Sequence, residues 1–279
     1  MIRKLWGDEE IGGRLYLQMC ELMQAVNFPE KEQKDAVWKV VFACMHKLTI
    51  LKHHQKQYEQ WERNKFVNAQ ARLKKSQRTR QEPEEYEEFE MIAELEAFLH
   101  QVKSSLDMLA KLLMHTANLG KGATSTFGDY GDRLGKKLRA GLLYKTEKKD
   151  LIEDLIKLIE DEQKTWLKFV VDLRDQISHW QGLSGLAFGY ILVAGKLTPT
   201  YPTINGKRIP DFLKLIQENL IGFHQDFLAL ALRIKFFPGL ELIPLDPAHG
   251  ESKYNHSSGR FVKWGIGMKN LPAGTTSGV

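Results

Sequence analysis

Apolar residues that recur every three or four positions over long stretches are the feature that most constrains the fold of this chain. The clearest stretch runs through Ile92, Leu95, Leu99, Val102, Leu106, Leu109 and Leu113. This spacing places the side chains on one face of an α-helix, and that face must be buried against other helices. Pro83 and the two glutamates after it suit the start of this helix, and Gly120 suits its end.

Two later stretches repeat the same spacing. One begins near Glu147–Asp150 and runs through Ile152, Leu155, Ile159, Trp166, Val170, Leu173 and Ile177. The other follows Pro210 and Asp211, runs through Leu213, Ile216, Leu220, Phe223, Phe227 and Leu230, and stops at Pro238-Gly239. Together the three stretches predict an all-α fold, an antiparallel helical bundle with long helices.

The N-terminal third is also predicted to be helical. Val37, Val41, Met45 and Leu48 share one face, but the segment then turns polar at His53-His54-Gln55. A helix that loses its apolar stripe usually leaves the core, so we expect this helix to project from the bundle. The sequence thus predicts one all-helical domain over residues 1–245, with a bundle core at about 85–235 and an N-terminal helical extension at about 28–80.

Two segments lack the helical pattern. Residues 182–208 are rich in Gly, Thr and Pro, and Tyr190–Val193 with the turn pair Asn205-Gly206 permits a small hairpin insertion. Residues 246–279 contain six Gly and little apolar periodicity. They are expected to form a loosely attached, Gly-rich C-terminal tail.

Charge is distributed unevenly along the chain. The net charge is +5, but seven basic residues and no acid lie between Arg63 and Arg80, and eight acids and no base lie between Glu82 and Glu96. These two runs are either solvated helix ends that attract each other across a turn or, for the basic run, a phosphate-binding strip. A second basic patch precedes the helix of Ile152–Ile177: Arg133, Lys136, Lys137, Arg139, Lys145, Lys148 and Lys149. Within it, Lys136, Lys137 and Arg139 are candidate RNA-binding residues.

The segment Arg174-Asp175-Gln176-Ile177-Ser178-His179 carries the most specific chemistry. A histidine can take the proton of a ribose 2′-hydroxyl and return one to a leaving oxygen. The planar fork of an arginine suits phosphate oxygens as negative charge builds on them. Asp175 lies four residues before His179, where it can hydrogen-bond the imidazole ring and fix its tautomer. These three residues can therefore cleave RNA without a metal ion.

Helical geometry separates the two main groups of this motif. At about 100° per residue, Arg174 and His179 differ by about 140° around one straight helix. They do not converge on one phosphate unless the helix bends or a second copy of the chain completes the site. Trp180 and Gly182 favour a helix that continues through His179, which supports a homodimer with a composite site.

An all-helical domain with Arg, a polar residue, a short gap and His near the end of a late helix resembles the HEPN superfamily, the higher eukaryote and prokaryote nucleotide-binding domains. The resemblance covers roughly residues 85–235, and RDQISH is its specific motif. Arg174 and His179 match the family's Arg and His, and Asp175 matches its polar position. The resemblance implies a metal-independent endoribonuclease that acts as a dimer, as a toxin or antiviral effector, with RNA and a cognate inhibitor as partners. Some members of the family have lost this activity and serve as binding modules.

Other motifs are weaker. The two cysteines do not form a metal-ligand spacing, His53-His54 has no acid or cysteine at ligand spacing, and the glycines between Gly120 and Gly131 lack the Lys and Ser or Thr of a phosphate-binding loop. No metal or cofactor is therefore expected. The chain has no apolar run long enough to span a membrane and no secretion signal at its start, so we expect a cytoplasmic protein.

Two functions follow from these observations. The first is a metal-independent endoribonuclease of HEPN type, with His179 as general acid or base, Arg174 as the phosphate-stabilising group and Asp175 as the residue that orients the pair. The alternative is a non-catalytic, HEPN-like helical dimer that binds nucleotide, RNA or a partner protein.

Overall fold

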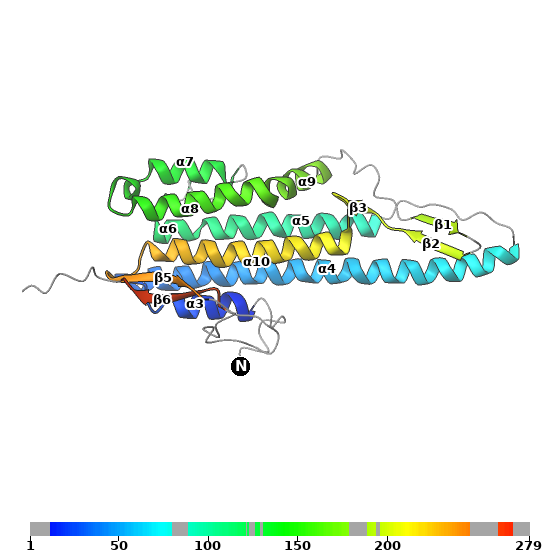
Figure 1. Cartoon of the computed structure of the whole chain (residues 1–279), viewed down its shortest axis with the longest axis horizontal. Helices are drawn as coiled ribbons and strands as arrows, with labels where there is room; N and C mark the ends of the chain where they lie inside the picture. Colours follow the sequence, from blue (N-terminus) through cyan, green and yellow to red (C-terminus); the bar gives the residue numbers. More distant parts are fainter. Residues whose placement is uncertain are drawn as a thin grey trace, which may run out of the picture. The chain divides into compact units, whose positions relative to one another are not determined.

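The protein is mostly helical, as the computed structural model in Figure 1 shows. The structure describes residues 12–79, 89–120, 122, 126–128, 131–178, 189–193, 196–245 and 262–269. Helices make up 73% of it and the strands are few and short, which confirms the all-α prediction. The antiparallel arrangement of the bundle stays a prediction. No helix among the described residues is long and apolar enough to cross a membrane.

The N-terminal half is dominated by one helix. A π-helical turn, η1 (Gly12–Tyr16), leads into α3 (Leu17–Leu22), and α4 (Lys31–Thr79) then runs for 49 residues. The expectation that the buried face of this helix ends at His53-His54-Gln55 is wrong, and projection of the helix from the bundle stays a prediction. Gln55, Tyr58 and Glu62 continue its buried face, because polar and aromatic side chains there take the positions that apolar residues hold earlier in the helix.

The helix predicted from the apolar stretch Ile92–Leu113 is observed as α5 (Phe89–Ala110), followed after one residue by α6 (Leu112–Thr116). Phe127, in the next connection, is buried, and its backbone N–H donates to the Asp107 carboxylate at 2.7 Å. Helix α7 (Asp132–Ala140) and a 3₁₀ turn, η3 (Leu142–Lys145), come next. Gly131, before α7, has φ +92°, and a Cβ there would lie 2.4 Å from Ile159 Cγ2, so only glycine fits this position.

The helix predicted over Ile152–Ile177, which leads into the RDQISH motif, is observed in three pieces: α8 (Lys149–Glu162), the π-helical turn η4 (Gln163–Leu167) and α9 (Lys168–Ser178). The wider turn of η4 adds residues to the repeat. Ile159 before this turn and Trp166 within it are both buried.

The insertion before the last helix contains two hairpins rather than one. Strand β1 (Gly189–Val193) pairs antiparallel with β2 (Lys196–Thr200), and β3 (Thr203–Ile204) pairs with β4 (Lys207–Arg208). The predicted turn pair Asn205-Gly206 joins β3 to β4 with φ of 51° and 71°. Two consecutive positive φ angles match the turn that closes tight hairpins. Helix α10 (Ile209–Arg233) follows immediately, with Pro210 in its first turn as predicted.

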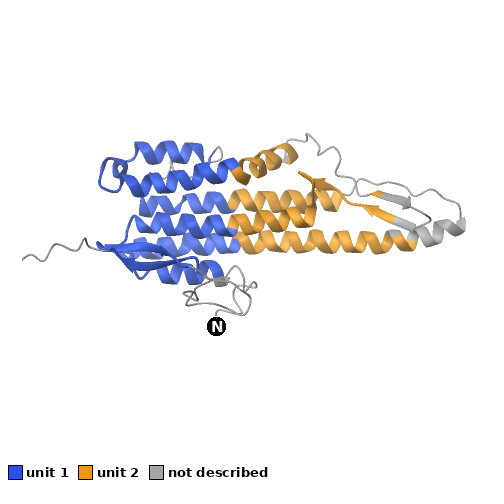
Figure 2. Cartoon of the chain, viewed as in Figure 1, with its two compact units in different colours: residues 1–46, 105–164, 221–279 blue, residues 47–104, 165–220 orange. Residues whose placement is uncertain are grey.

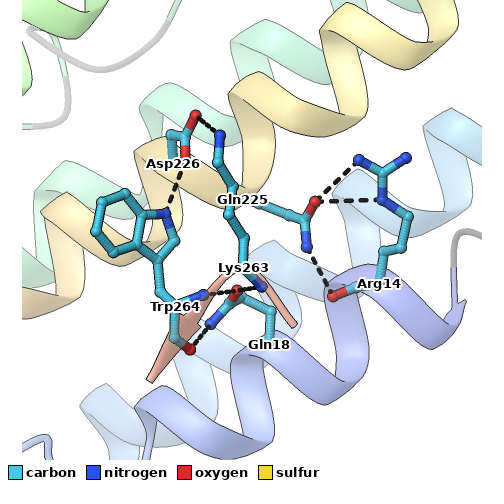
Figure 3. Close-up of polar contacts among 6 residues, drawn as sticks. All are labelled: Arg14, Gln18, Gln225, Asp226, Lys263 and Trp264. Atoms are coloured by element: carbon cyan, nitrogen blue, oxygen red, sulfur yellow. Dashed lines mark hydrogen bonds and ion pairs between the residues drawn. The ribbon is translucent and has the colours of Figure 1, made fainter. Parts of the chain in front are cut away.

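Part of the C-terminal segment is folded, unlike the loosely attached tail that we expected. Strand β6 (Trp264–Met268) pairs antiparallel with β5 (Leu240–Pro244). The buried Gln18 side chain accepts from the backbone N–H groups of Lys263 and Trp264, both at 2.9 Å, and donates to the Trp264 carbonyl at 2.7 Å. Asp226 on α10 accepts from the Trp264 indole at 2.7 Å and pairs with Lys263 (Figure 3). Side chains from two helices therefore hold this strand.

Contacts divide the chain into two compact units (Figure 2). Unit 1 contains residues 1–46, 105–164 and 221–279, and unit 2 contains residues 47–104 and 165–220. The core of unit 1 includes the rings of Phe127, Phe223 and Phe227, which contact one another. The core of unit 2 includes Leu95, Leu99, Val170 and Leu213. Helices α4, α5 and α10 each contribute residues to both units, and the single-domain prediction stays a prediction.

Candidate functional site

The RDQISH motif begins in the last turns of α9, in unit 2. Val170 and Leu173 are buried and fix the inner face of this helix. Arg174 follows Leu173 and is half-buried, whereas Asp175 and Gln176 are more open to solvent. The helix thus presents a partly sheltered guanidinium beside an accessible carboxylate.

Arg174 and Asp175 form an ion pair. Arg174 Nη1 lies 3.1 Å from Asp175 Oδ1, with 23% of the arginine side chain and 46% of the aspartate side chain exposed. The Arg174 Nε atom is buried and makes no hydrogen bond. A guanidinium has five N–H donors, so the pair with Asp175 leaves donors that can contact another acceptor. A phosphate oxygen is an acceptor of the right geometry and charge.

His179 lies outside the described residues, as do Trp180 and Gly182. Helix α9 ends at Ser178 in the part of the chain that the structure describes. The hydrogen bond from His179 to Asp175, the continuation of the helix through His179 and the composite site therefore stay predictions. The observed partner of Asp175 is Arg174, so this carboxylate already positions one of the two main groups of the motif.

The predicted RNA-binding residues of α7 differ in how they are engaged. Arg139 Nη2 pairs with Glu160 at 2.9 Å and lies 3.6 Å from Glu153. The hydrogen bond to Glu160 raises the pKa of this guanidinium. Lys137 Nζ donates to the Gly122 carbonyl at 3.0 Å, and Lys136 is exposed. Two carboxylates beside Arg139 reduce its attraction for a phosphate, and the role of all three residues in binding RNA stays a prediction.

A histidine–carboxylate pair in unit 2 was not predicted from the sequence. His54 Nδ1 lies 2.8 Å from Glu94 Oε2, with side chains 22% and 29% exposed. These residues are 40 positions apart and become neighbours only when α4 and α5 pack together. Glu94 is one of the eight acids of the acidic run, and nothing in the sequence near His54 indicates which of them it contacts. The pair could therefore not be predicted from residue spacing.

A second unpredicted cluster surrounds Glu62, also in unit 2. Its Oε2 atom accepts from Arg208 Nη2 at 3.1 Å, while its Oε1 atom is buried without a hydrogen bond. Burial raises the pKa of Glu62, and Arg208 opposes this shift. The Arg208 guanidinium also lies over the Tyr201 ring, 3.9 Å from its centroid. Arg208 thereby ties the β3–β4 hairpin to α4.

The described residues contain no group of three or more histidine, cysteine, aspartate or glutamate side chains that can hold a metal ion. Comparison with protein-family models, with curated proteins and with solved structures found no significant match.

Proposed function

We propose that this protein is a metal-independent endoribonuclease of HEPN type whose catalytic residues are Arg174, Asp175 and His179. The observation that carries the proposal is the Arg174–Asp175 ion pair in the last turns of α9, with Asp175 four residues before His179 in the sequence. An arginine that is half-buried and oriented by a neighbouring carboxylate is suited to hold a phosphodiester.

The proposed reaction is an internal transfer within RNA. The ribose 2′-oxygen attacks the adjacent phosphorus and forms a P–O2′ bond, while the P–O5′ bond breaks. His179 accepts the proton of the 2′-hydroxyl and, in its protonated form, returns a proton to the leaving 5′-oxygen. Arg174 stabilises the negative charge on the phosphoryl oxygens. The products are a 2′,3′-cyclic phosphate and a free 5′-hydroxyl, so water is not consumed in this step.

A homodimer is part of the proposal. Residues 168–178 form a regular α-helix. If the helix continues through His179, as the sequence predicts, His179 and Arg174 are about 140° apart around its axis. Two groups so far apart on one helix do not approach the same phosphate. In a two-fold dimer, Arg174 of one chain and His179 of the other can meet at a shared site.

A non-catalytic binding module is the second candidate, and the same ion pair favours it. Arg174 is already neutralised in part by Asp175, and a fixed cation beside a helix end can bind a nucleotide or RNA phosphate without cleaving it. This candidate predicts RNA binding that depends on Arg174 but leaves the RNA intact.

The deciding experiment is incubation of the purified protein with a set of fluorescent RNAs in the presence of EDTA. The endoribonuclease is expected to produce fragments that end in a 2′,3′-cyclic phosphate, and RNA with 2′-deoxyribose at the scissile nucleotide is expected to resist. Cleavage of the deoxy-substituted RNA at the same position would contradict the mechanism, because its nucleophile is absent. Binding without cleavage would favour the second candidate. His179→Ala protein, prepared in the same way, controls for contaminating nucleases.

A further inference from the structure

Two lysines from distant parts of the sequence lie together in unit 1. Lys148, just before α8, donates from Nζ to the Ile234 carbonyl at 2.7 Å. Ile234 follows the last residue of α10, and Lys235 is next in the chain. Both lysine side chains are half-buried. The contact brings the Lys148 ammonium group to the end of α10, beside Lys235.

Neither lysine is neutralised by an acid among the residues that the structure describes. Arg233, two residues before Lys235, pairs with Asp154 at 3.0 Å, so the nearest arginine is compensated. The exposed Glu147 and Asp150 flank Lys148 in the sequence but form no ion pair with it. Burial, and then the nearby charge of Lys148, lowers the pKa of Lys235.

The end of α10 does not balance these charges. The carboxyl end of a helix carries about half a negative charge, which one ammonium group already exceeds. The Lys148 ammonium satisfies the Ile234 carbonyl with one of its three N–H donors and keeps two. The Lys148 ammonium group, held at the Ile234 carbonyl, and the half-buried Lys235 next in the chain therefore bring an excess of positive charge to the end of α10.

We propose that Lys148 and Lys235 together bind a backbone phosphate of single-stranded RNA. A phosphate supplies the negative charge that the pair lacks and accepts hydrogen bonds from both ammonium groups. The choice of RNA as the source of the phosphate rests on the proposed function. Lys145, at the end of η3, and Lys149, at the start of α8, are exposed and can attract neighbouring phosphates. We assign phosphate binding to these two lysines rather than to Arg139, because the charge of Arg139 is already engaged by Glu160 and Glu153.

The test measures binding of a 2′-O-methyl RNA oligonucleotide, which cannot be cleaved by the proposed mechanism. Lys148→Gln with Lys235→Gln is expected to weaken binding about tenfold and to reduce the slope of log K against log salt by about 0.7 for one lost phosphate contact. Glutamine at position 148 keeps an N–H donor for the Ile234 carbonyl. If the double variant does not fold, Lys235→Gln alone provides the measurement, with a smaller loss of the same sign.

The matched control is Lys157→Gln. Lys157 is an exposed lysine of α8 in the same unit, and its loss removes one charge, as Lys235→Gln alone does. Its variant is expected to bind RNA within about twofold of the unaltered protein. Equal losses in Lys157→Gln and in Lys235→Gln would overturn the site in favour of a general charge effect.

Amine labelling supplies a second readout. A lysine with a lowered pKa reacts faster with an amine-selective reagent at neutral pH, so Lys235 is expected to be labelled before Lys157. The oligonucleotide is expected to protect Lys235 several-fold, and inorganic phosphate to do so only at higher concentration. Protection by phosphate alone, or by anionic lipid vesicles but not by the oligonucleotide, would overturn the assignment to RNA. Absence of protection by any of these would overturn the site.

Failure of this site and failure of the proposed activity are distinguishable. Cleavage by the unaltered protein with no effect of the two lysines on binding leaves the endoribonuclease and removes the Lys148–Lys235 site. Binding that depends on the two lysines, without cleavage, would support the Lys148–Lys235 site and contradict the endoribonuclease activity.

Discussion

The Arg174 guanidinium is held by the carboxylate of the next residue, with 3.1 Å between Nη1 and Asp175 Oδ1. Adjacent residues of a helix point about 100° apart, so this contact turns the two side chains toward each other. The arginine is thereby restrained before any ligand binds. This restraint suits a group that meets a phosphate, since less freedom is lost on binding.

The first prediction concerns the motif residues. Arg174→Ala and His179→Ala are each expected to lower the rate of RNA cleavage by at least about 10²-fold, the usual effect of removing a charge stabiliser or a general base. Arg174→Lys keeps the charge but loses the planar fork, so its rate should lie between those of the unaltered protein and Arg174→Ala. Initial rates on a fluorescent RNA, with circular dichroism to verify folding, give the comparison. His115→Ala, on α6, is the control and should be nearly silent.

The second prediction concerns the shared site. Arg174→Ala and His179→Ala chains are each expected to be nearly inactive, and a mixed dimer of the two is expected to regain activity, because one of its sites has both an intact Arg and an intact His. Two affinity tags purified in tandem isolate the mixed dimer for the cleavage assay. Activity no higher than that of either variant alone would mean that the site lies within one chain, with a bend before His179.

The third prediction concerns the attachment of β6 in unit 1. Asp226 accepts from the Trp264 indole and pairs with Lys263, and its side chain is 14% exposed. Asp226→Ala should therefore lower the free energy of unfolding by about 2–3 kcal/mol, because it leaves a partly buried indole donor and a cation without their acceptor. Urea denaturation measures this change. Asp161→Ala removes only an exposed pair with Lys164 and should change stability by less than about 0.5 kcal/mol. Similar losses in both variants would show that Asp226 does not anchor the strand.

The fourth prediction concerns Glu62 and pH. Burial raises the pKa of Glu62 in the folded protein, while Arg208 opposes the shift and Asp211 and Glu59 add to it. Between the ordinary glutamate pKa and the raised one, the unfolded chain has released a proton that the folded protein keeps, so stability falls as pH rises through this window. Glutamine does not titrate and can still accept from Arg208.

Glu62→Gln is therefore expected to gain stability relative to the unaltered protein as pH rises from about 4 to 7. Urea midpoints at several pH values measure the difference. Glu90→Gln, at an exposed position of α5, is the control and should follow the unaltered protein at every pH. A difference between Glu62→Gln and the unaltered protein that shrinks over this range would contradict the predicted sign.

The helices were the part of this fold that the sequence could predict. Pro210 at the start of α10 and the apolar spacing of α5 act within a few residues, and local spacing is what decides which face of a helix is buried. The Asn205-Gly206 turn was predictable for the same reason, because positive φ angles favour these residues. In the candidate site, the sequence predicted Arg174 and Asp175 as functional residues but assigned Asp175 to His179, whereas its observed partner is Arg174, its neighbour in the chain.

Tertiary structure decided the contacts between distant residues. Gln55, Tyr58 and Glu62 extend the buried face of α4. Their polar groups predict an exposed face, and they are buried only because other parts of the chain, including Arg208, pack over them. Strand β6 contains two glycines and little strand signal, and it forms because Gln18 and Asp226 satisfy its backbone and side-chain donors. Lys148 and Lys235 are 87 positions apart in the sequence. They become neighbours only because the start of α8 lies beside the end of α10. Spacing along the chain reports which face of a helix is apolar, but the partner of a polar group depends on which helices meet.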